Sequence, residues 1–124
     1  MPSLPHVNFA GLDVTRLIIG GNPFSGFSHQ SRERDAEMLD YYTVARIKET
    51  LARAEAAGIN TAVMRCDAHI QRLLREYYNE GGQIQWIAQV PGDRSLVGFA
   101  AEVRRMAAAG AKAAPAAPAP EEPE

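Results

Sequence analysis

The densest set of reactive side chains is the stretch from Arg65 to His69, which reads Arg-Cys-Asp-Ala-His. The guanidinium of Arg65 either pairs with a carboxylate, Asp67 or Asp93, or binds an anionic ligand. Asp67 and His69 are both of a type that ligates metals, but a metal site needs at least a third ligand and we find no second such cluster in the sequence. We therefore predict no metal site, and we interpret Asp67 as a helix N-cap and Cys66 as a buried, inert thiol.

A second group of candidate residues follows the apolar run 17–19, where the sequence continues Gly-Gly-Asn-Pro-Phe-Ser-Gly-Phe-Ser-His. Gly21 either permits a tight turn or lets backbone amides approach a ligand closely. Asn22 belongs to a turn or binds the ligand through its amide, and His29 is either exposed to solvent or part of the site. Together with Gln89, which ends a later apolar run, the predicted ligand-binding residues are Gly21, Asn22, His29, Arg65, Asp67, His69 and Gln89.

Three short apolar runs and three helical stripes must position these side chains. The runs lie at residues 17–19, 61–64 and 84–90, and the stripes lie at 43–58, 67–82 and 95–110. Short apolar runs that alternate with amphipathic helices ending in glycine are typical of parallel βα units. Ligands of such folds bind at the carboxyl ends of the strands, which is where all the candidate residues fall.

The repeating pattern predicts an α/β fold of three parallel βα units, forming a partial (βα)8 TIM barrel over residues 1–112. A doubly wound dinucleotide fold is less favoured, because Gly-Gly-Asn-Pro at 20–23 is not the Gly-x-Gly-x-x-Gly fingerprint. A whole barrel has eight units and about 250 residues, so we interpret the chain as a truncated or frameshifted N-terminal portion. The alternative is a half-barrel that pairs through the open edge of its third strand. Residues 113–124, AAPAAPAPEEPE, are predicted to be a disordered Pro/Ala/Glu tail.

Composition narrows the class of protein. The formal net charge is −2 and no basic run is present, which argues against nucleic-acid binding. No stretch approaches the roughly 18 apolar residues of a membrane span, and no signal peptide is recognised at the N-terminus. The single cysteine favours a reducing compartment, so we expect a cytoplasmic protein.

Two segments resemble the aldo/keto reductases. Residues 8–21, NFAGLDVTRLIIGG, look like the opening of that family, in which a small hairpin precedes a short strand ending in glycine. Residues 56–61, AAGINT, are similar to its passage into the second strand, and the segments 20–51 and 69–89 look like uncharacterised bacterial (βα)-barrel proteins near that family. The resemblance covers about residues 8 to 112 and implies a barrel of oxidoreductase ancestry. The Asp and Tyr of the reductase motif are absent after Asn60, so no catalytic residue is carried over.

The functional expectation is an N-terminal fragment of an aldo/keto reductase-like protein, inactive alone, that contributes loops to a small-molecule site. Enzymatic activity, cofactor and substrate are left open by the sequence. Two alternatives stay open beside it: a half-barrel that assembles with itself into a binding module or enzyme, and a non-enzymatic interaction protein.

Overall fold

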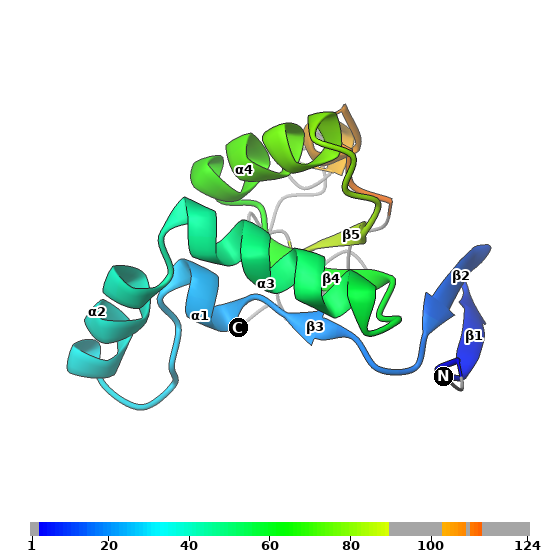
Figure 1. The fold of residues 1–124 in the computed structure, drawn as a ribbon. Helices are drawn as coiled ribbons and strands as arrows, with labels where there is room; N and C mark the ends of the chain where they lie inside the picture. Colours follow the sequence, from blue (N-terminus) through cyan, green and yellow to red (C-terminus); the bar gives the residue numbers. More distant parts are fainter. Residues whose placement is uncertain (1–2, 90–102, 109, 113–124) are drawn as a thin grey trace, which may run out of the picture.

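The computed structural model describes residues 3–89, 103–108 and 110–112. In chain order the labelled elements are β1 (His6–Phe9), β2 (Leu12–Thr15), β3 (Ile19–Gly20), α1 (Asn22–Ser25), α2 (Arg32–Tyr41), α3 (Val44–Ala56), β4 (Thr61–Arg65), α4 (Ala68–Asn79) and β5 (Gln85–Gln89). Residues 103–108 are also helical. The hairpin β1-β2 is an antiparallel sheet of its own, while β3, β4 and β5 form a parallel sheet in that order. Figure 1 shows the hairpin beyond one end of the parallel sheet and α2 beyond the other.

The hairpin turns through two residues in the left-handed backbone region. Ala10 has φ 51° and Gly11 has φ 81°. Positive φ at both central residues matches the right-handed twist of the two strands, so the turn joins them without splaying.

Helices α3 and α4 cover one face of the parallel sheet. The side chain of Thr43 caps α3, accepting a hydrogen bond from Arg46 N at 3.3 Å. Of the two predicted stripes, Val44 is exposed and Tyr78 is partly buried. The other members are buried: Ile47, Leu51, Ala54, Ile70, Leu73, Leu74 and Tyr77. They pack in one cluster with the strand side chains Ala62, Met64, Trp86 and Ala88. Trp86, fully buried, donates from Nε1 to Met64 O at 3.0 Å, which satisfies its polar atom inside this core.

On the opposite face of the parallel sheet, the side chains beyond the buried Thr61 are only partly buried or exposed. Val63 pairs with Ile87 and Arg65 with Gln89 in the β4-β5 register. Because side chains alternate between the two faces of a strand, these four lie away from the helices. This face of the sheet is therefore apolar in its middle, at Val63 and Ile87, and polar at its carboxyl end, at Arg65 and Gln89.

The prediction of three parallel βα units forming a partial barrel is wrong. The described residues form one antiparallel pair and an open three-stranded parallel sheet, and three helices, α1 to α3, separate β3 from β4. The expected first strand fails because Thr15 Oγ1 donates to Leu17 O at 2.7 Å and holds a bend there. Leu17 and Ile18 are consequently exposed, at 57% and 38%, and only Ile19 and Gly20 pair with β4.

The last described residues return to the edge of β5. Met106, on the helical segment 103–108, is buried in the main cluster, and Lys112 N donates to Trp86 O at 2.8 Å. The edge that was predicted to be open is therefore bonded by the chain itself at this point. Three predictions lie outside the described residues: the end of the third strand at Val90, the start of the third helix at Ser95 and the tail 113–124.

Because of Tyr78, the free energy of unfolding is expected to change with pH in the alkaline range. Its hydroxyl donates to Ile84 O at 2.9 Å, and burial, followed by the charge of Glu55, raises the pKa of Tyr78 to about 12. Since an unfolded tyrosine titrates near 10, the contribution of the neutral phenol is complete below about pH 10 and is lost as the pH rises through about 12. We expect the free energy of unfolding to fall more steeply over this window in the wild type than in Tyr78→Phe. Tyr41→Phe, at an exposed position, should keep the wild-type slope; equal slopes in all three proteins would contradict the prediction.

Candidate functional site

Arg65 lies at the carboxyl end of the central strand β4, between an aromatic ring and a carboxylate. Its guanidinium carbon is 4.3 Å from the centre of the Phe27 ring, and its Nε lies 3.4 Å from Asp67 Oδ1. Both charged side chains are about one quarter exposed, at 26% each. Of the two partners named by the sequence, the structure thus shows Asp67, whereas Asp93 lies outside the described residues. Phe27, whose role no spacing rule indicated, makes a cation–π contact with the guanidinium.

Asp67 and His69 are both engaged with the rest of the protein. Asp67 is the N-cap residue of α4, but its side chain makes no capping hydrogen bond because its carboxylate is directed to Arg65. The predicted carboxylate cap is therefore wrong, although the helix begins where expected. His69 Nε2 donates to Phe24 O at 3.0 Å and joins α4 to α1. That contact gives His69 a structural role at this edge and occupies one of its two ring nitrogens.

Gly21 is buried against the central strand rather than presented to solvent. A Cβ placed on it would lie 2.7 Å from Met64 Cγ and 3.1 Å from Met64 Cα. The absence of a side chain therefore lets the β3-α1 connection approach β4 closely. Of the two interpretations of Gly21, close packing is the one that this contact supports.

The remaining predicted site residues lie farther from this contact set or take part only through their backbone. Asn22 is exposed at the start of α1, where its carbonyl accepts from Phe27 N at 3.0 Å. His29 is exposed with φ 58°, in the loop before α2. Gln89 pairs with Arg65 in register, and its side chain is exposed while its carbonyl accepts from Cys66 N at 3.3 Å. The structure thus brings together Arg65, Asp67 and Gln89, whereas no side-chain contact within the described residues links Asn22 or His29 to them.

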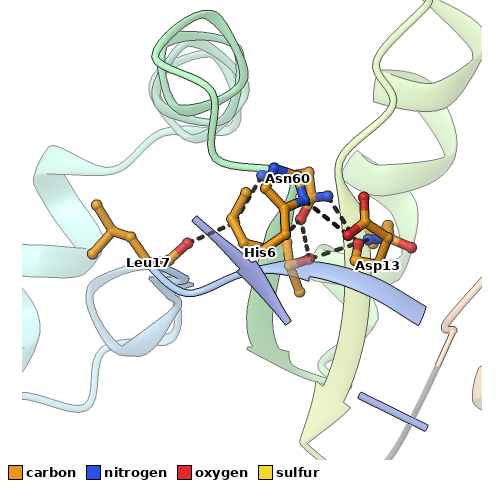
Figure 2. Close-up of polar contacts among 7 residues, drawn as sticks. His6, Asp13, Leu17 and Asn60 are labelled. Carbon is orange, nitrogen blue, oxygen red and sulfur yellow. Dashed lines mark hydrogen bonds and ion pairs between the residues drawn. The ribbon is translucent and has the colours of Figure 1, made fainter. Parts of the chain in front are cut away.

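Asn60 organises a second polar cluster at the amino end of the sheet, which sequence reasoning missed. Its Oδ1 accepts from Thr15 N at 2.9 Å and from Thr61 Oγ1 at 2.7 Å, and its Nδ2 donates to Asp13 O at 2.9 Å. Asn60 N also donates to Thr15 Oγ1 at 3.2 Å. Figure 2 shows Asn60 facing Asp13 across these contacts. The cluster fastens the hairpin onto the parallel sheet.

An apolar groove lies between the hairpin and the open face of the parallel sheet. Its volume is about 440 Å³, within the range of small-molecule sites. Its walls combine hairpin residues such as Phe9 with Val63 and Ile87 from β4 and β5. This groove cannot be recognised from the sequence, because the apolar run 17–19 predicts a buried strand, whereas Ile18 lies in a wall of the groove.

Within the described residues, no three His, Cys, Asp or Glu side chains are grouped so that they could hold a metal ion. No helix in the described part of the chain is long and apolar enough to cross a membrane. No protein-family model matches the chain, and neither a curated protein nor a solved structure matches it.

Proposed function

We propose that the chain supplies the anion-recognising part of a small-molecule site at the carboxyl end of its parallel sheet. The observation that carries the proposal is the arrangement of Arg65, whose Nε is turned to Asp67 while its guanidinium carbon lies over the Phe27 ring. Among the residues that the structure describes, no hydrogen bond uses its two terminal nitrogens. Those nitrogens are donors with the spacing to bind a carboxylate or a phosphate in a bidentate manner.

The surroundings of Arg65 favour recognition of a ligand over a purely structural ion pair. The contact with Asp67 is long, at 3.4 Å, and uses one donor of five. Stacking on Phe27 restricts the guanidinium before a ligand arrives, which lowers the entropy lost on binding. Gln89 stands opposite Arg65 in the register and offers further donors on the same face.

Arg65→Gln is expected to weaken anion binding by about tenfold, the size of one lost charged hydrogen bond. Binding of inorganic phosphate and of acetate is followed by the amide NMR shifts of residues 65–69, because the two probes separate a phosphate from a carboxylate preference. Arg75→Gln, an exposed arginine on α4, is the matched control and should leave both affinities unchanged. Asp67→Asn removes the competing carboxylate and should raise the affinity about threefold. Equal anion affinity in wild type and Arg65→Gln would overturn the proposal.

Several broader expectations belong to this proposal. The isolated chain is inactive, since no catalytic residue can be assigned to it, and its single cysteine is consistent with a cytoplasmic location. A relationship to the aldo/keto reductases rests on the hairpin, the strand ending at Gly20 and the residues quoted for it. Self-assembly through the edge of β5 has less support, because Lys112 already donates to Trp86 O on that edge.

A further inference from the structure

The apolar groove is lined by parts of the fold that are held in place by hydrogen bonds. Its apolar lining consists of Val7, Phe9, Val14, Ile18, Val63 and Ile87. Val14 and Thr15 on the hairpin side are buried, and Asn60 bonds Thr15 directly to the start of β4. The hairpin is therefore held in a fixed position beyond the amino end of β4, so the groove exists before anything binds.

A single charged residue, Arg16, lines this groove. The backbone amide of Arg16 donates to Pro5 O at 2.8 Å, which anchors the residue at the end of the hairpin. In the described part of the chain its guanidinium takes part in no ion pair, whereas the nearby Asp13 carboxylate is paired with His6. An exposed, unpaired guanidinium at the rim of an apolar groove complements a ligand with one anionic end.

We propose that the groove binds a small amphipathic acid, an apolar chain or ring that carries one carboxylate. The apolar part lies against Val63, Ile87 and Phe9, and the carboxylate contacts Arg16. This site is distinct from the one at Arg65, since Val63 and Arg65 are two residues apart along β4, about 7 Å, and the residues that line the groove do not include Arg65.

Charge complementarity and the size of the groove favour this occupant over a protein surface. A volume of about 440 Å³ suits a ligand of small-molecule size. The chain has a formal net charge of only −2. A second copy would therefore have to supply an acidic group to Arg16 from a surface with little net charge. The acid brings its own anion and its own apolar part, so both features of the groove are used by one molecule.

The test compares butanoate, hexanoate, octanoate and 1-octanol, with binding followed by the methyl NMR shifts of Val63 and Ile87. The affinity of the acids is expected to rise by up to about fourfold for each added CH₂. Arg16→Gln should weaken octanoate about tenfold while leaving 1-octanol unchanged, and Arg75→Gln should change neither. Phe9→Ser should weaken octanoate, in contrast to Leu39→Ser, which alters an equally exposed residue on α2.

Three results would overturn the inference. They are an octanoate affinity no higher than that of butanoate, identical octanoate binding by Phe9→Ser and Leu39→Ser, or failure of octanoate to bind while sedimentation shows a dimer that Phe9→Ser dissociates. The last result would assign the groove to a second copy of the chain. Phosphate binding at Arg65 should not depend on Arg16, so failure at one site is distinguishable from failure at the other.

Discussion

Replacing Asn60 with alanine is expected to lower the free energy of unfolding by about 2–4 kcal/mol, because it removes several hydrogen bonds and leaves buried partners unsatisfied. The backbone amide of Thr15, a residue with no exposed surface, loses its acceptor at 2.9 Å. Asp13 O loses the donor Nδ2, and Thr61 Oγ1 loses its acceptor. Urea denaturation followed by circular dichroism measures the change through the midpoint.

The control for this prediction is Asn79→Ala, at the exposed end of α4. No side-chain hydrogen bond of Asn79 is found among the described residues, so its replacement should change the free energy of unfolding by no more than about 0.5 kcal/mol. If both alanine variants unfold at the same urea concentration, Asn60 does not fasten the hairpin as the contacts indicate. A selective loss in Asn60→Ala should also abolish octanoate binding in the groove, since the hairpin wall would no longer be fixed.

Helices and strands with a strong periodic pattern were predictable from sequence. The stripe of α4 and the caps of α3 follow from local rules, because apolar spacing and an N-cap threonine act within one or two turns. The run at 17–19 has the composition of a buried strand and therefore predicts one. In the structure the hydrogen bond from Thr15 Oγ1 to Leu17 O bends the chain at this point. A short apolar run does not reveal such a contact, so the sequence predicts the first strand two residues before β3 begins.

The contacts of the candidate site are likewise of two kinds: some join neighbours in the sequence, and others join segments far apart in it. The pairing of Arg65 with Asp67 was one of the predicted alternatives, since the two residues are neighbours in sequence and at a strand end. The contact of Arg65 with Phe27 and that of Asn60 with Thr15 join segments 38 and 45 residues apart. Neither residue type nor spacing identifies these pairs, because both depend on how the loop after β3 and the hairpin fold back on the sheet.

Gly21→Ala is expected to lower the free energy of unfolding by about 1–3 kcal/mol, the usual cost of overpacking a close contact. The new Cβ would lie 2.7 Å from Met64 Cγ, and Met64 has no exposed surface into which it could move. Gly20→Ala is the matched control, because a Cβ on Gly20 meets nothing within 4 Å. Thermal unfolding of the two variants therefore separates the two interpretations of the glycine pair.

The comparison of the two alanine variants decides what the glycine pair at 20 and 21 does. A stability loss confined to Gly21→Ala assigns Gly21 to packing of the β3-α1 connection on β4, as the contact with Met64 indicates. Unchanged stability in both variants, together with weaker phosphate binding in Gly21→Ala, would instead assign it to close approach of a ligand. We expect the first outcome, since the new Cβ would clash with Met64 Cγ at 2.7 Å and would lie in tight contact with Met64 Cα at 3.1 Å, a backbone atom that cannot rotate away. A loop displaced by this clash would also move Phe27 off the guanidinium of Arg65.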